Sequence, residues 1–193
     1  MKFNYKITDA GWATCELESS SQQFSFEASC ISDALKEFLE AIVRLNPDID
    51  PEFYEDETEC SWHQEPGLIE WEFNISEIKS TEENLFFTVK QYEDDSRKHR
   101  PFIDVKFSCN YDKFVSSIVT SLESLITEFG LVGYAEMWDG ADFPIANYLK
   151  LKQYTIDKAV FPAVTETIDD SLKTTTSLEY EMKLLITNLK NIK

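Results

Sequence analysis

Glycine, proline, histidine and cysteine are all scarce in this sequence of 193 residues, which contains 5, 6, 2 and 4 of them. So little glycine and proline excludes collagen-like and low-complexity chains. Two histidines leave few groups for general acid–base catalysis. Glycine-rich phosphate and dinucleotide loops, the GxSxG nucleophile turn, HExxH and zinc-finger spacings are also missing. The sequence therefore indicates no catalytic residue, no metal ligand and no cofactor.

Long apolar runs are missing as well. No stretch approaches the about 20 consecutive apolar residues of a membrane-spanning helix, and the N-terminal residues lack the apolar stretch of a signal peptide. We therefore expect a cytoplasmic protein with no membrane contact. Cys15, Cys30, Cys60 and Cys109 show no CxxC spacing, so we expect free, sheltered thiols rather than disulfides.

Basic residues are outnumbered two to one, with 18 against 36 acidic residues, for a formal net charge of −18. Residues 1–100 hold 23 acids and 9 bases, and residues 101–193 hold 13 acids and 9 bases. Such a chain should repel nucleic acid and anionic membranes and attract basic proteins or cations. A basic protein partner is therefore the expected partner class, and a merely soluble acidic protein is the alternative.

Hydrophobic residues make up 42% of the chain and aromatic residues 13%, which is enough for one large core. Alternating apolar residues predict strands over about 2–8, 12–18 and 24–28. A second, cleaner set of alternating strands follows at 69–75, 85–90 and 103–109. One face of each is apolar and the other polar, which favours an antiparallel sheet.

Helical periodicity appears between and after these strands. Ser32 is the predicted N-cap of a first helix, whose apolar stripe ends before Pro47. A second helix is predicted over 111–129, with Gly130 as the residue that follows its C-terminus. A short helix is expected at 145–152, after an aromatic segment.

The predicted order βββ-α-βββ-α indicates a single α+β domain over residues 1–156. It would consist of one antiparallel sheet of about six strands with helices on one face. Residues 157–175 have the composition of a linker. Residues 176–193 are predicted to form a C-terminal amphipathic helix that begins with a capping box at Thr176 to Glu179. Its apolar stripe should pack on the domain or form a homodimer with a second copy.

The segment Ser61 to Gly67, SWHQEPG, contains one of the two histidines. Pro66 and Gly67 are typical of the central positions of a type II turn, with a positive φ at the glycine. His63 could act as a base with Glu65 or Cys60, but residues i and i+3 of an extended segment point to opposite faces. We therefore interpret the segment as a turn that leads into a strand.

Residues 48–59, DIDPEFYEDETE, concentrate acidic side chains without any base among them. The spacing partly matches a calcium-binding EF-hand loop, but Phe53 occupies the position that requires glycine, and Pro51 intrudes. A solvated acidic loop and a docking surface remain the main interpretations. Phe53 and Tyr54 favour docking, because aromatic side chains surrounded by charge are typical interface anchors. The candidate partner-binding residues of this acid run are Asp48, Asp50, Glu52, Phe53, Tyr54, Glu55, Asp56, Glu57 and Glu59.

A second candidate surface is the segment Glu136 to Phe143. Its Asp139-Gly140 pair indicates a turn. Its large apolar residues are typical of a core, and a second patch of interface is the alternative. The candidate partner-binding residues here are Glu136, Trp138, Asp139 and Asp142.

The stretch Ile31 to Leu35, the tripeptide Glu65 to Gly67 before Trp71, and the segment Gly130 to Trp138 resemble an uncharacterised bacterial family. That resemblance would cover about residues 10–150 and carries over no catalytic residue. Small acidic α+β proteins of this style also resemble in type the immunity proteins of bacterial toxin systems, including contact-dependent inhibition.

We therefore expect a non-enzymatic acidic binding protein, an immunity or inhibitor protein for a basic toxin such as a nuclease. A small-molecule enzyme or ligand-binding domain, with its pocket between sheet and helices, is one alternative. A DNA mimic, whose carboxylates imitate phosphates, is another.

Overall fold

The first three strands form an antiparallel three-stranded sheet in the order β1-β2-β3. Their inward side chains form continuous rows, in which Tyr5 of β1 pairs with Cys15 of β2, and Cys15 pairs with Phe26 of β3. All three are buried. The strands are β1 (Lys2–Asp9), β2 (Trp12–Glu18) and β3 (Gln23–Ser29).

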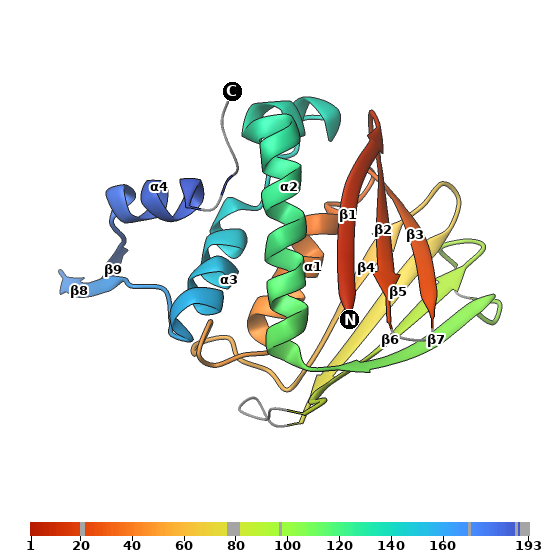
Figure 1. Ribbon diagram of the computed structural model, residues 1–193, viewed down its shortest axis with the longest axis horizontal. Helices are drawn as coiled ribbons and strands as arrows, with labels where there is room; N and C mark the ends of the chain where they lie inside the picture. Colours follow the sequence, from red (N-terminus) through yellow and green to blue (C-terminus); the bar gives the residue numbers. More distant parts are fainter. Residues whose placement is uncertain (20–21, 77–81, 97, 170, 188, 190–193) are drawn as a thin grey trace.

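The next four strands form a separate antiparallel sheet in the order β4-β5-β6-β7. Its strands are β4 (Glu57–His63), β5 (Leu68–Ile75), β6 (Leu85–Tyr92) and β7 (Ile103–Cys109). The α+β class is confirmed, but the prediction of a single sheet of about six strands is wrong. Figure 1 shows the two sheets facing each other, with the helices beside them. The computed structural model describes residues 1–19, 22–76, 82–96, 98–169, 171–187 and 189.

Aromatic side chains fill the space between the two sheets and the helix α1 (Ala34–Arg44). Phe26 of the first sheet meets Trp71 of the second, with ring centroids 5.5 Å apart. Phe38 of α1 lies 5.3 Å from Trp71 and 5.0 Å from Phe3 of β1, again between centroids. These contacts join both sheets and α1 in one hydrophobic core.

The start of α1 differs from the sequence prediction by one residue. Asp33, not Ser32, occupies the N-cap position, and its side chain makes no capping hydrogen bond. The Ser32 hydroxyl instead accepts a hydrogen bond from the backbone N–H of His63 at 3.0 Å, and Ser29 donates to the His63 carbonyl at 3.1 Å. The two serines thereby tie the end of β3 and the start of α1 to β4.

The turn predicted at Ser61 to Gly67 lies between β4 and β5, but its geometry is not type II. The Glu65–Pro66 peptide bond is cis, and Gly67 does not have a positive φ. Gly67 is needed for space, since a Cβ there would lie 2.7 Å from the carbonyl oxygen of Tyr92. His63 and Cys60 point to opposite faces of β4, as the strand geometry requires.

The long helix α2 (Tyr111–Met137) begins at Asn110, whose side chain accepts a hydrogen bond from the backbone N–H of Lys113. Gly130 has φ 67° and ψ −178°, so the helix is interrupted where the sequence predicted its end, and a further helical segment follows. An 18-residue window of α2 has a mean hydropathy of 1.3, so by length and composition α2 could cross a membrane. A helix buried in a protein core can meet the same criterion, so the absence of a membrane span stays a prediction. Phe114 and Ile118 are buried in the core.

Two serines of α2 cover the free edge of β1. The backbone N–H of Tyr5 donates to the Ser121 hydroxyl at 2.8 Å, and the N–H of Phe3 donates to Ser117 at the same distance. An uncovered strand edge would leave these donors without partners or open to pairing with another chain. The spacing between two serines one helical turn apart matches the spacing between every second backbone N–H of the strand, so each serine reaches one donor.

We expect Ser121→Ala to lower the free energy of unfolding by about 1–3 kcal/mol, because the buried N–H of Tyr5 would lose its acceptor. Urea unfolding would measure the change. Ser124→Ala is the matched control, since the Ser124 hydroxyl is exposed and only donates to the Thr120 carbonyl; it should stay within about 0.5 kcal/mol of wild type. Equal effects of both substitutions would show that the hydroxyl does not stabilise the strand edge.

Beyond α3 (Ile145–Asp157), the chain forms a C-terminal arm, which we define as residues 158–189. The arm contains β8 (Val164–Ile168), β9 (Ser171–Thr175) and α4 (Leu178–Ile186). The predicted linker at 157–175 is thus largely a hairpin. The N-cap of the last helix is Ser177, which accepts from the N–H of Tyr180, rather than Thr176, where the predicted capping box begins. The helix ends at Ile186 rather than 193, and residues 190–193 lie outside the described part of the chain.

All four cysteines are free, as predicted, and Cys15, Cys60 and Cys109 are buried while Cys30 is half-buried. Burial raises the pKa of the Cys15 and Cys60 thiols well above the usual value and that of Cys109 to about 12. Because the thiolate is the reactive form, these three side chains are packing residues rather than nucleophiles.

Candidate partner-binding surface

The acid run, residues 48–59, leaves α1, passes beside α3 and enters β4 (Figure 1). Its first carboxylates are half-buried, and those from Glu52 onward are exposed. Two of the seven are neutralised by bases that lie outside the run. Asp50 lies 2.9 Å from the Nζ of Lys150 on α3, and Glu55 pairs with Arg44 at the end of α1.

The other five carboxylates of the run form no ion pair with a basic side chain in the described part of the chain. Glu57 only accepts a hydrogen bond from the Asn74 amide, at 2.8 Å. No group of three or more His, Cys, Asp or Glu side chains converges on one point among the described residues, so these carboxylates do not form a calcium cage there. The five unpaired side chains are Asp48, Glu52, Asp56, Glu57 and Glu59.

Both aromatic residues of the acid run are exposed, Phe53 by 59% and Tyr54 by 40%. Phe53 lines a depression of about 360 Å³, together with Glu40, Arg44 and Asp50. Large apolar side chains at such exposure lose the free energy that burial would give them. Their position amid carboxylates fits an interface anchor.

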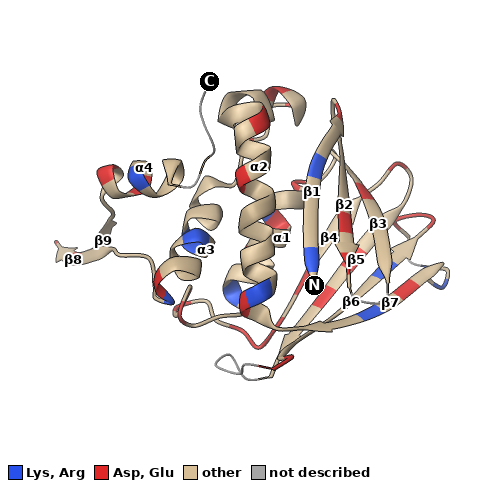
Figure 2. Ribbon diagram, viewed as in Figure 1, with Lys and Arg blue, Asp and Glu red and all other residues tan. Residues whose placement is uncertain are grey.

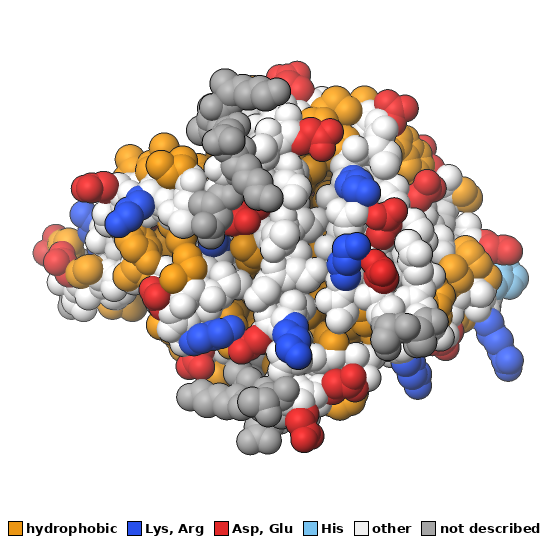
Figure 3. All heavy atoms as spheres, in the orientation of Figure 1, with side chains coloured by type: hydrophobic (Ala, Val, Ile, Leu, Met, Phe, Trp, Pro, Cys, Tyr) orange, Lys and Arg blue, Asp and Glu red, His pale blue; other side chains and the backbone are white. Residues whose placement is uncertain are grey.

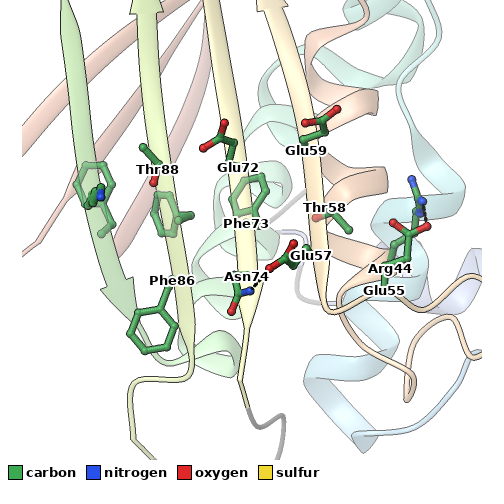
Figure 4. A pocket seen from close by; sticks show the side chains of 13 residues that line it. Arg44, Glu55, Glu57, Thr58, Glu59, Glu72, Phe73, Asn74, Phe86 and Thr88 are labelled. Atoms are coloured by element: carbon green, nitrogen blue, oxygen red, sulfur yellow. Dashed lines mark hydrogen bonds and ion pairs between the residues drawn. The ribbon is translucent and has the colours of Figure 1, made fainter. Parts of the chain in front are cut away.

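The acid run continues onto the outer face of the four-stranded sheet. Glu57 and Glu59 of β4 face outward because the alternate residues Thr58, Cys60 and Trp62 are buried. Together with β5 and β6 they line a concavity of about 760 Å³, shown in Figure 4. The further outward side chains around it include Glu72, Asn74, Phe86, Thr88 and Lys106.

Register places two like charges directly opposite each other in this concavity. Glu59 of β4 is the cross-strand partner of Glu72 of β5, and like charges at such positions destabilise a sheet. Glu72 is also paired with Lys90 of β6 at 2.6 Å, and the hydrogen bond between them raises the pKa of Lys90. Glu59 forms no ion pair within the described residues. Negative charge is therefore least compensated at Glu59.

Phe86 also belongs to this surface, but it lies on β6, outside the acid run, and the sequence analysis did not identify it as a candidate. It is 44% exposed on the outer face of β6, where its neighbours Thr88 and Lys90 are polar. The signal was present in the sequence, because an aromatic residue on the polar face of an alternating strand is out of pattern. We call the acid run together with this concavity the acidic surface; Figure 2 shows its acidic positions on the strands and loops.

The second candidate segment divides between surface and core. Glu136, Asp139 and Asp142 are exposed near the end of α2, so they are available to a partner. Trp138 is not, because it is buried between Tyr5 and Tyr134, with ring centroids 6.5 and 6.3 Å away. The interpretation of Trp138 as a partner-binding residue is therefore wrong, and its core alternative holds.

A small-molecule enzyme or ligand-binding domain was expected to have its pocket between sheet and helices. Packed aromatic side chains of the core occupy that space. Comparisons of the chain with protein-family models, with curated proteins and with solved structures found no match. The case for a function therefore depends on the geometry and charge of the acidic surface.

Proposed function

We propose that this protein binds a basic protein partner through the acidic surface, and that it acts as an immunity or inhibitor protein for a basic toxin such as a nuclease. The observation that carries the proposal is the exposure of Phe53, Tyr54 and Phe86 within the incompletely neutralised acidic surface. Phe53 lines one depression and Phe86 the other, and Arg44 lines both, so the two depressions are adjacent.

Charge and shape would have separate roles in such an interface. Five unpaired carboxylates of the acid run give a field that draws a cationic protein and speeds association, an effect that salt weakens. The aromatic side chains would gain free energy only when they are buried, so they would slow dissociation. A loop that served only solubility would gain nothing from exposing Phe53 and Tyr54.

If the protein is a DNA mimic, the same carboxylates would bind only partners that normally bind DNA. A partner that normally binds DNA would contact them with its phosphate-binding side chains. Double-stranded DNA added as a competitor would then displace the protein from its partner. A basic partner whose contact site lies away from its DNA-binding cleft would stay bound.

The proposal is tested with the product of the adjacent gene, purified in an inactive form, by binding kinetics at several salt concentrations. Neutralising Glu52, Asp56, Glu57 and Glu59 to their amides should slow association several-fold at low salt. Phe53→Ala should instead speed dissociation, with a loss of about 2 kcal/mol in binding free energy. Co-expression with the active partner then reports protection of the cells.

The matched control neutralises Glu128, Glu136, Asp139 and Asp142, four exposed acids near the end of α2. It changes the net charge by the same amount at another place, so it separates a local contact from a general effect of net charge. If the control variant loses association rate while the acid-run variant binds and protects like wild type, the acidic surface is not the interface.

A further inference from the structure

The hairpin of the C-terminal arm lacks the packing that normally stabilises two strands. Every residue of β8 and β9 is exposed, including Val164, Ile168 and Leu172, the last by 77%. A two-stranded hairpin that packs against nothing is marginally stable in water. In Figure 1 the hairpin projects from the body at the end opposite the two sheets.

The helix of the arm also carries apolar side chains without a partner. Leu178, Met182 and Ile186 recur every four residues, so they form one stripe, and all three are more than half exposed. Between α4 and α3 lies an apolar groove of about 320 Å³. Hydrophobic side chains gather on this part of the surface in Figure 3. The apolar residues lining the groove include Ile145, Leu149, Phe161, Leu178, Met182 and Leu185.

The arm is held against the body rather than trailing from it. Lys152 of α3 donates to the carbonyl oxygens of Leu185, at 3.4 Å, and of Thr187. Tyr180 of α4 donates to the side chain of Gln153, and its ring lies 5.7 Å from that of Phe161. The groove and the stripe are therefore presented in a fixed geometry, which lowers the entropy lost when they are covered.

Net charge divides sharply at the start of the arm. Residues 158–193 contain 5 acids and 5 bases, so the whole charge of −18 belongs to residues 1–157, which have 31 acids and 13 bases. A cationic partner would be drawn to the body and gains no attraction at the arm. A second copy of this chain would be repelled by the body but not by the arm.

We propose that the arm is a homodimer interface, in which the hairpin of each chain covers the α3–α4 groove and the α4 stripe of the other. The arm carries both a projecting apolar element and an apolar groove, which is what a two-fold symmetric contact needs from one chain. The interface extends beyond the C-terminal helix to the hairpin and α3, and it is independent of the acidic surface.

The effect of salt on affinity would distinguish this self-association from the binding of a basic partner. Screening weakens the repulsion between two highly acidic bodies, so self-association should tighten as salt is added. Attraction to a basic partner should weaken over the same range. The two interactions therefore have opposite salt dependences, and failure of one does not imply failure of the other.

The test is sedimentation equilibrium of the full chain over a range of concentrations and salt. We expect wild type to approach twice the chain mass of 22.4 kDa, more readily at high salt. Leu172→Asp in the hairpin and Met182→Asp on α4 should each raise the dimer dissociation constant by about tenfold or more. Val132→Asp is the matched control, because Val132 is also 77% exposed but lies near the end of α2; it should leave the constant unchanged.

Circular dichroism would verify that each variant is folded, which the exposure of all three positions favours. A single-chain mass at every concentration and salt would overturn the proposal. So would a dimer that is weakened by Val132→Asp but not by the two substitutions in the arm.

Discussion

Replacing Lys152 with methionine is expected to release the C-terminal arm and to lower the free energy of unfolding by about 2–3 kcal/mol. The Lys152 side chain is almost fully buried and its Nζ lies 3.0 Å from Glu123 of α2 and 3.0 Å from the hydroxyl of Tyr148. Methionine has a similar volume but no charge, so the substitution removes the ion pair while leaving little empty space. Glu123 is partly exposed, which places the expected loss below that of a fully buried pair.

The same ammonium group is the main polar link between the body and the end of α4. Its hydrogen bonds to Leu185 and Thr187 satisfy carbonyl groups that a helix C-terminus leaves without intrahelical partners. A cation at this end of a helix is also favoured by the helix dipole. Without Lys152, the described contacts that hold the helix in place are those of Tyr180 and the apolar packing of Leu184, Leu185 and Leu189.

Two measurements would follow the release of the arm. The melting temperature should fall by roughly 5–10 °C for a chain of this size, and trypsin should cleave faster after Lys183 in α4. Lys150→Met is the matched control, because Lys150 also lies on α3 beside the groove, but its ion pair is a more exposed one with Asp50 and not with the arm; its effect should not exceed about 1 kcal/mol. Restoring part of the stability with Glu123→Gln in addition would identify the orphaned carboxylate as a cause.

An unchanged melting temperature together with an unchanged cleavage rate in Lys152→Met would contradict this account. The arm would then be held by its apolar contacts alone. Because the released arm would also lose the groove between α3 and α4, the variant should no longer form the proposed dimer.

For the six strands that it predicted, sequence alternation indicated which face is buried, but not which strands share a sheet. Ile69, Trp71 and Phe73 point inward as predicted, yet the same pattern fits one six-stranded sheet or two smaller ones. The division arises in three dimensions. The ring of Phe26 on one sheet meets that of Trp71 on the other edge-on across the interior, rather than beside it in a ladder. The helix α2 covers the β1 edge with two serines.

The sequence analysis missed two elements, β4 and the β8–β9 hairpin, because of their amino-acid composition. In β4 the alternation of Thr58, Cys60 and Trp62 with Glu57 and Glu59 is regular, but the acidic residues favoured the interpretation of a loop. In the hairpin of the arm every residue of β8 and β9 is exposed, so there is no buried face that alternation could indicate. Strand formation there follows from β-branched residues, which is a weaker signal than burial.

Only the part of the candidate site that is contiguous in the sequence could be predicted. The acid run is contiguous in the sequence, and its exposed aromatic residues were found there. Glu72 and Phe86 join the acidic surface through the pairing of β4, β5 and β6, a register that a single sequence does not specify. The sequence also could not predict that Lys150, 100 residues away in the chain, neutralises Asp50.

Glu59→Lys is expected to stabilise the fold while weakening the proposed partner complex. The introduced ammonium would stand opposite Glu72, so a repulsive cross-strand pair becomes attractive, a gain of about 0.2–1 kcal/mol in the free energy of unfolding. The same ammonium would meet cationic side chains of a basic partner. Like charges in an interface should cost about 2 kcal/mol or more, roughly a thirtyfold rise in the dissociation constant.

The opposite signs of the two effects make the prediction stringent, since damage to the fold would lower stability and affinity together. Glu27→Lys is the matched control: Glu27 is exposed on β3 of the other sheet and pairs with Thr14 rather than with an acid. It makes the same change in net charge, so it should slow association only slightly and leave stability nearly unchanged. Thermal melting and binding kinetics at two salt concentrations would measure both quantities. If Glu59→Lys binds the partner as tightly as Glu27→Lys does, Glu59 lies outside the interface, and the carboxylate pair on β4 and β5 has no role in recognition.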